Sequence, residues 1–264
     1  MARFGKFVKL TSSKVPSADD GLMLTRPDSM PPPRFSDSSL QSQIAERLLP
    51  LGFAALMVIG GATAMFVELA PYTSADTPLS ARVIELADGN LDYGLSTSSR
   101  HVLLADCRAA MVSLIASLQT TPVRRSLNSN CLSFSDRIVA EQPTFSIAWL
   151  TGALAAAQLA DWDGFNERLS KSTRTGAVEQ WIAQIRVAIA EDYHDRLDAE
   201  NAAGNQTDMR LMTDTDAGLL ALARVYLMSP ASRGRITAVV DRTDQITHEK
   251  FLRRVRMLSS GEVV

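Results

Sequence analysis

Apolar and polar residues divide the chain into three segments of different character. Residues 1–47 contain many prolines and serines and no apolar period long enough to bury a helix face, so we expect a disordered tail. Residues 48–67 read LLPLGFAALMVIGGATAMFV and carry no charge. From residue 71 onwards, apolar residues recur at intervals of three and four, the period of amphipathic helices. The pattern predicts an all-α protein with a tail, one transmembrane helix and an external helical domain.

The uncharged segment predicts a transmembrane helix at residues 48–70. At about 1.5 Å per residue, its length matches the roughly 30 Å hydrocarbon core of a bilayer. We expect Pro50 in its first turn, and Glu68 and Pro71 at its end. The alternative is a cleaved signal peptide with an A-x-A site at residues 62–64, but the preceding leader is unusually long and the apolar run continues past that site. A buried helix of a soluble protein is disfavoured, because no charge interrupts any face.

The basic residues on either side of this helix predict its orientation. Seven Lys and Arg residues precede it, whereas the twenty or so residues after it contain only Arg82. By the positive-inside rule, residues 1–47 are cytoplasmic and residues 71–264 are external, which in a bacterial inner membrane means periplasmic. Gly60 and Ala64 form a pair of small residues that would let another helix approach closely, including one from a second copy of the chain.

Apolar periodicity also predicts the individual helices of the external domain. They are expected near residues 78–88, 98–119, 122–141, 144–160, 162–172, 177–198, 207–228, 230–244 and 247–259. Thr77-Pro78, Thr121-Pro122 and Ser229-Pro230 each predict a helix start, with a hydroxyl N-cap before a proline. No run alternates with a period of two, so we expect no sheet.

The two cysteines lie at similar distances from the expected turn between helices 98–119 and 122–141. Cys107 and Cys131 both fall on apolar stripes, a spacing that predicts a disulfide across an antiparallel hairpin in an oxidising compartment. Two buried free thiols are the alternative if the domain is cytoplasmic. We do not expect a catalytic thiol, because neither cysteine has a histidine close in sequence or lies in a C-x-x-C motif.

Residues 143–172 carry a resemblance to a known family. An Ala-rich helix with Trp149 and Gly152 leads through the acidic-aromatic turn Asp161-Trp162 to a second helix with Phe165. This arrangement resembles one helical hairpin of the tetratricopeptide repeat family. Phe165 stands where the family prefers alanine, and no proline closes the unit, so the sequence departs from the pattern at two points.

The resemblance covers about 30 of the 264 residues. Trp181 follows Trp149 by 32 residues, close to the family's period of about 34. We nevertheless expect one long helix at 177–198, so the array is at most degenerate. The resemblance implies closely packed hairpins whose concave face holds peptides or partner helices.

Composition limits the chemistry that the chain can perform. The 27 basic and 29 acidic residues give a net charge of −2, so strong nucleic-acid binding is not expected. With three histidines and two cysteines, a metal site would have to recruit carboxylates. No nucleotide-binding, nucleophile-elbow or zinc-protease motif occurs. We therefore predict no enzyme activity, and no catalytic, cofactor or metal site.

The densest polar cluster, EDYHDRLDAE, covers residues 191–200. On one continuous helix His194 and Asp198 would share a face and could hold a divalent ion, but we favour a solvated helix end because no second element supplies a ligand. Residues 161–164 begin like a calcium loop and lack the later ligands, so we interpret them as a repeat turn. The acidic residues at 214–216 fit a helix start.

The C-terminal helix combines an apolar side with a basic one. Its apolar side carries Phe251, Leu252, Val255 and Leu258. The candidate interaction surface on the remainder consists of Lys250, Arg253, Arg254 and Arg256. These cations either offset the helix macrodipole or bind an acidic partner, an anionic polysaccharide or lipid headgroups.

These features favour a membrane-anchored, non-enzymatic scaffold or adaptor with protein partners in a bacterial envelope complex. The plan is similar to that of accessory proteins in surface-polysaccharide synthesis and export. The alternative is a single-pass receptor whose external domain binds a ligand or peptide, although the tail contains no output domain. An enzyme is the third hypothesis.

Overall fold

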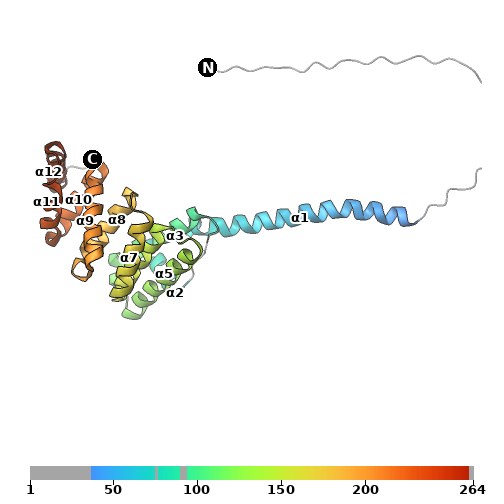
Figure 1. Ribbon diagram of the computed structural model, residues 1–264. Coiled ribbons are helices and arrows are strands. Elements are labelled where there is room, and N and C mark those ends of the chain that lie inside the picture. Colours follow the sequence, from blue (N-terminus) through green and yellow to red (C-terminus); the bar gives the residue numbers. More distant parts are fainter. Residues whose placement is uncertain (1–36, 75–76, 90–93, 262–264) are drawn as a thin grey trace, which may run out of the picture. The chain divides into compact units, whose positions relative to one another are not determined.

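Every regular element in the described part of the chain is helical, which confirms the predicted all-α fold. The computed structural model describes residues 37–74, 77–89 and 94–261. The chain divides into two units, Met1–Ala55 and Leu56–Val264. The second unit contains the end of α1 (Asp37–Ser74) and all the other helices (Figure 1). Residues 1–36 of the expected tail lie outside the described residues.

Helix α1 is longer than the sequence pattern predicted. It includes residues 37–47, which we had assigned to the tail and which are rich in good helix formers such as Gln, Ala and Glu. It also continues through Glu68 and Pro71, so the expected end at these residues was wrong, and Pro50 lies inside the helix rather than in its first turn. Its segment Pro50–Thr73 is long and apolar enough to cross a membrane, and none of the apolar window is buried.

Eleven further α-helices follow in the described residues, most of them short. They are α2 (Leu79–Asp88), α3 (Thr97–Met111), α4 (Leu114–Ser117), α5 (Thr121–Glu141), α6 (Ser146–Gln158), α7 (Trp162–Thr175), α8 (Gln180–Asp192), α9 (Ala199–Thr213), α10 (Asp216–Met228), α11 (Arg233–Val240) and α12 (Gln245–Ser260). Single 3-10 turns cover His194–Arg196 and Pro230–Ser232.

Two apolar cores meet at α8. The first lies among α2 to α8, with Phe134 and Phe165 among its largest buried side chains. The second lies among α8 to α12 and includes Met209 and Phe251. Because Ile182 of α8 packs into the first core and Val187 into the second, α8 forms the wall that the two cores share.

Three of the expected long helices are interrupted, so their predicted extents were wrong. The helix expected at 98–119 ends at Met111, and Ser113 caps the separate helix α4. The helix expected at 177–198 ends at Asp192. The helix expected at 207–228 is two helices, α9 and α10, since Thr215 caps α10 and a Cβ on Gly218 would lie 2.1 Å from the Met212 carbonyl oxygen.

The three predicted hydroxyl-proline caps were also wrong. Pro78 itself occupies the N-cap of α2, and α5 starts one residue earlier than expected, after Thr120, without a side-chain cap. Ser229 precedes a 3-10 turn and makes no capping bond. Other side chains do cap helices. Each accepts a hydrogen bond from the backbone N–H of the residue three positions later, as Ser96 does from Ser99. The others are Ser113, Asp161, Asp198, Thr215 and Asp244.

A buried ion pair joins α8 to its neighbours. Nε and Nη2 of Arg186 donate to the two carboxylate oxygens of Asp208 on α9, each at 2.7 Å. Nη1 donates to the carbonyl oxygens of Ser172 and Gly176, where α7 ends. The two charged side chains are only 2% and 5% exposed. One guanidinium therefore fixes three helices in a water-free environment.

Asp208→Ala should lower the free energy of unfolding by about 3 to 5 kcal/mol, because Arg186 would remain buried without its counter-charge. Urea denaturation of the detergent-solubilised full-length protein, followed by circular dichroism, measures this loss. Glu167→Ala is the matched control: it removes the ion pair with Lys171, whose side chains are 61% and 41% exposed, and should cost less than about 1 kcal/mol. Equal losses in both variants would contradict the assigned role.

Candidate functional site

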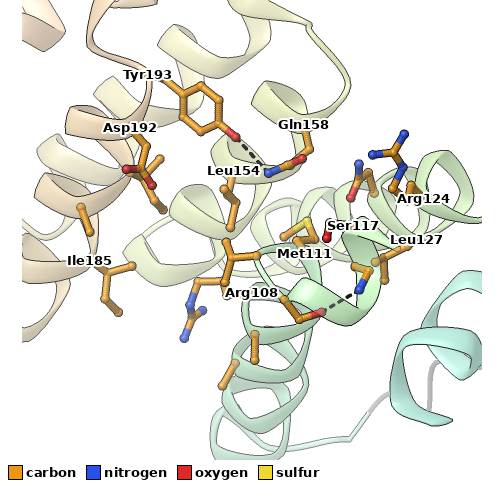
Figure 2. Close-up of a pocket in the computed structure, with 18 of the residues that line it drawn as sticks. Arg108, Met111, Ser117, Arg124, Leu127, Leu154, Gln158, Ile185, Asp192 and Tyr193 are labelled. Atoms are coloured by element: carbon orange, nitrogen blue, oxygen red, sulfur yellow. Dashed lines mark hydrogen bonds between the residues drawn. The ribbon is translucent and has the colours of Figure 1, made fainter. Parts of the chain in front are cut away.

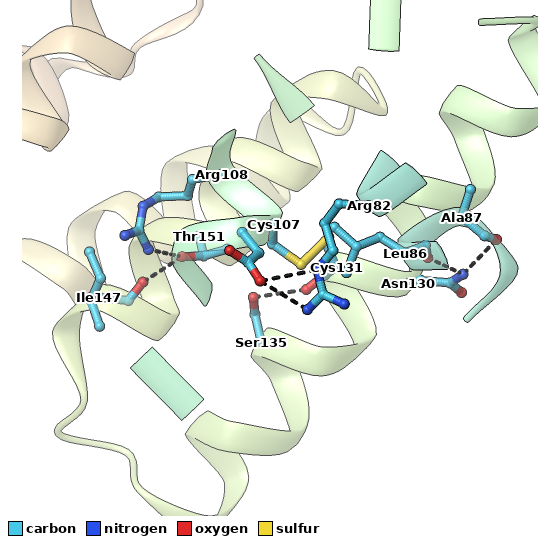
Figure 3. The surroundings of a disulfide bond; sticks show 11 residues. Arg82, Leu86, Ala87, Cys107, Arg108, Asn130, Cys131, Ser135, Ile147 and Thr151 are labelled. Carbon is cyan, nitrogen blue, oxygen red and sulfur yellow. Dashed lines mark hydrogen bonds and ion pairs between the residues drawn. A yellow bond between two sulfur atoms is a disulfide. The ribbon is translucent and has the colours of Figure 1, made fainter. Parts of the chain in front are cut away.

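The cysteines are joined in the structure, as their spacing predicted. Cys107 on α3 and Cys131 on α5 form a disulfide with Cα atoms 5.8 Å apart, and both side chains are fully buried (Figure 3). Polar contacts surround the bond. Nδ2 of Asn130 donates to the carbonyl oxygens of Leu86 and Ala87 at the end of α2, both at 3.0 Å. The disulfide and these bonds hold α2, α3 and α5 together.

A pocket of about 800 Å³ lies near this disulfide: its lining includes Arg108, the residue after Cys107, and Leu127 and Asn128, one turn before Cys131. Its walls come from α3, α4, α5, α6 and α8, with Met228 at the end of α10 (Figure 2). The larger apolar side chains that line it are Met111, Leu127, Leu154, Ile185 and Ile189. Its size and lining are those of a ligand-binding pocket.

Arg108 is a positively charged residue that lines this pocket. It directly follows Cys107, is half-buried, and its Nη1 donates to Thr151 Oγ1 at 2.8 Å. Among the described residues, no carboxylate lies within ion-pair distance of its guanidinium. Burial lowers the pKa of Arg108 to about 10, so the group stays protonated at neutral pH. The pocket therefore contains a positive charge that no side chain of the described residues neutralises.

A second polar group lies at the α8 end of the pocket. Tyr193 and Gln158 are bonded to each other, with Gln158 Nε2 donating to Tyr193 Oη at 2.9 Å. The pKa of Tyr193 is raised by burial and, to a lesser extent, by the charge of Asp192. Partial desolvation, together with neighbouring Glu191, raises the pKa of Asp192 as well. This end is thus acidic, in contrast to the Arg108 side.

Several large apolar side chains at and near the pocket remain exposed. Val112 and Met228, both among its lining residues, are 64% and 85% exposed. Leu114 and Leu118, at either end of the short α4, are 75% and 76% exposed. Clustered exposed apolar side chains mark surfaces that contact another molecule.

The acidic cluster at 191–200 is divided among three elements, which separates the candidate metal ligands. The side chain of Glu191 is buried inside the domain. It accepts hydrogen bonds from Arg235 Nη2 and from Asn205 Nδ2, both at 2.6 Å. His194 lies in a 3-10 turn, and Asp198 is the N-cap of α9, so the shared helical face assumed from the sequence does not exist. In the described residues, no group of three potential metal ligands occurs.

The basic residues of α12 lie in the middle of that helix rather than at its end. The last turn, before Ser260, contains no basic residue, so the macrodipole interpretation was wrong. Lys250 Nζ lies 3.6 Å from an Asp216 carboxylate oxygen. In the described residues, no carboxylate pairs with Arg253, Arg254 or Arg256. Arg253 and Arg256 are exposed, and Arg254 is half-buried.

Gly60 and Ala64 are both exposed on α1, with nothing within 4 Å of the position of a Cβ on Gly60. Near the end of the same helix, Glu68 accepts hydrogen bonds from the N–H groups of Leu95 and Ser96, both at 2.9 Å, and from both Ser96 Oγ and Ser99 Oγ. The end of α1 is therefore bonded to the start of α3, the helix that carries Cys107 and Arg108.

The chain matches no known protein family, no curated protein and no solved structure. Sequence reasoning found the disulfide pair but missed Arg108, because an arginine on a helix is ordinary until the positions of all carboxylates are known.

Replacing both cysteines, as Cys107→Ala/Cys131→Ala, should lower the free energy of unfolding by about 3 kcal/mol, the chain-entropy value for a closed loop of this size. Urea denaturation measures the loss, and dithiothreitol should reproduce most of it in the wild type while leaving the variant unchanged. In intact cells, a maleimide should label neither cysteine unless the protein is first reduced and unfolded. Labelling without reduction would contradict the bond.

Proposed function

We propose that this protein is a membrane-anchored, non-enzymatic scaffold or adaptor in a bacterial envelope complex. The observation that carries the proposal is the segment Pro50–Thr73, which is apolar, unburied and continuous with a helical domain. An unburied apolar helix of this length needs lipid or another helix around it. The closest functional analogy remains the accessory proteins of surface-polysaccharide synthesis and export, which is an analogy of architecture.

The proposed orientation has the N-terminus in the cytoplasm and the helical domain in the periplasm, with α1 in the inner membrane. The excess of Lys and Arg before the span supports it. The Cys107–Cys131 pair also supports it, because disulfides persist in the periplasm and are rare in the cytosol.

Consecutive helical hairpins support a repeat-like scaffold. Helices α6 and α7 pack against each other, as do α8 and α9. The expected long helix at 177–198 was one departure from a repeat pattern, and it is absent, whereas Phe165 and the missing proline remain departures. Stacked hairpins give extended surfaces that hold protein partners, so we retain the tetratricopeptide-like character of the domain as part of the proposal.

A single-pass receptor is the second candidate function. The 800 Å³ pocket with its unpaired arginine favours it, because a scaffold needs no such pocket. The two functions predict that different molecules co-purify with the protein.

Affinity purification of the full-length protein in mild detergent separates them. A scaffold should retain a reproducible set of envelope proteins in fixed ratios after size-exclusion chromatography. Recovery of a lone chain carrying a bound small molecule would instead support the receptor.

Gly60→Leu should reduce association through the membrane helix at least several-fold, because its side chain fills the surface that lets a second helix approach. The measurement is the yield of cross-linked dimer, or of co-purified membrane partners, from cells expressing tagged protein. Ala62→Leu adds similar bulk on the other side of α1 and is the matched control. Equal yields from both variants would remove Gly60 and Ala64 from the proposed contact.

A further inference from the structure

We propose that the pocket near the disulfide binds a single-chain anionic amphiphile, a molecule with an alkyl chain and one carboxylate, whose headgroup pairs with Arg108. This inference goes beyond the scaffold role and does not depend on it. It assigns the pocket a ligand class from charge, lining and volume.

Arg108 and Arg254 are the two half-buried arginines of the described residues that contact no carboxylate, and of these only Arg108 lines the pocket. Within residues 77–89 and 94–240 of the described chain, the other buried or half-buried arginines each contact a carboxylate; these are Arg82, Arg100, Arg168, Arg186 and Arg235. Arg108 instead has one neutral partner, the hydroxyl of Thr151. A partly desolvated guanidinium has donors left for a carboxylate, which it binds in a bidentate arrangement.

The rest of the pocket suits an alkyl chain. Met111, Leu127 and Leu154 line the middle, and Ile185 and Ile189 of α8 form another wall. In Figure 2 the side chain of Arg108 lies between the apolar groups of α3 and Ile185, so a headgroup bound there keeps its chain against apolar atoms. A volume of about 800 Å³ accommodates a chain of ten or so carbons with its headgroup.

The acidic end of the pocket restricts the ligand to one anionic group. Asp192 would repel a second carboxylate, and Tyr193 Oη already accepts a hydrogen bond from Gln158 Nε2. Arg124, a further lining residue, has only the Thr121 hydroxyl as a bonded side chain among the described residues and adds positive potential. The charges therefore favour a monoanion over a dianion or a cation.

Photolabelling tests the proposal. The full-length protein in phosphatidylcholine nanodiscs is irradiated with a decanoic acid that carries a diazirine on its alkyl chain, and labelled residues are mapped by mass spectrometry. We expect labels on the pocket side chains of α3, α5, α6 and α8, in addition to labels on α1. Labelling of α1 is the internal standard, because that helix is exposed to any lipid-soluble probe.

Arg108→Gln should reduce pocket labelling relative to α1 at least fivefold, and Arg108→Lys should retain part of it. Ala109→Phe provides a variant that fills the pocket from an exposed position without changing the charge, and it should reduce labelling even if Arg108→Gln folds poorly. Arg210→Gln removes an exposed arginine on α9, outside the pocket and outside the basic surface of α12, and should have no effect.

The alcohol analogue of the probe distinguishes a headgroup site from a general apolar surface. It should label the pocket at least fivefold less than the acid while labelling α1 equally. Equal pocket labelling by acid and alcohol, an unchanged ratio in Arg108→Gln folded as judged by circular dichroism, or labelling confined to α1 would each overturn the proposal.

Discussion

The arrangement of the helical domain depends on the bidentate ion pair between Arg186 and Asp208. It lies on α8, the helix that both apolar cores share, and its third nitrogen reaches the end of α7. Burying two charges costs desolvation energy that apolar residues would not incur. The pair therefore contributes more to specifying how the helices are arranged than to the net free energy of folding. A slipped register of α8 against α9 would leave both charges unpaired in an apolar environment. The pair therefore selects one register, and with it the positions of Ile185 and Ile189 in the pocket wall.

The opposite wall is fixed by a covalent constraint. Cys107 directly precedes Arg108, and Cys131 lies one helical turn after Leu127, so the disulfide sets the separation of the two wall residues. Between the bonded walls, α6 supplies Leu154 and the hydroxyl of Thr151 that orients Arg108. A pocket between two independently fixed walls keeps its shape when empty. This pre-organisation lowers the entropic cost of binding.

The sequence predicted those elements whose buried faces are apolar. Helix α5 starts and ends within one residue of its expected limits, because Leu127, Cys131, Phe134 and Ile138 repeat with helical period and are all buried. Helix α9 was missed over its first half because it buries polar side chains, Asn201, Asn205 and Asp208. Their partners, such as Glu191 and Arg186, lie in another helix, so no local pattern identifies them. For the same reason the sequence did not predict the role of Arg108. Whether an arginine has a carboxylate partner depends on where the whole fold places the charged side chains.

One carboxylate connects the apolar helix α1 to α3, the helix that carries Arg108. Glu68 would be costly at the end of an apolar span, yet it accepts hydrogen bonds from two backbone N–H groups and two hydroxyls at the start of α3. Helix α3 is cross-linked to α5 at Cys107, so its two ends are held by different partners. A movement of α1 along or around its axis must then either carry α3 and α5 with it or break the bonds to Glu68. Because Arg108 directly follows Cys107 on α3, the first outcome moves the charged group of the pocket, and the second separates α3 from the end of α1. The bonds to Glu68 therefore couple the end of α1 to the helix that carries Arg108.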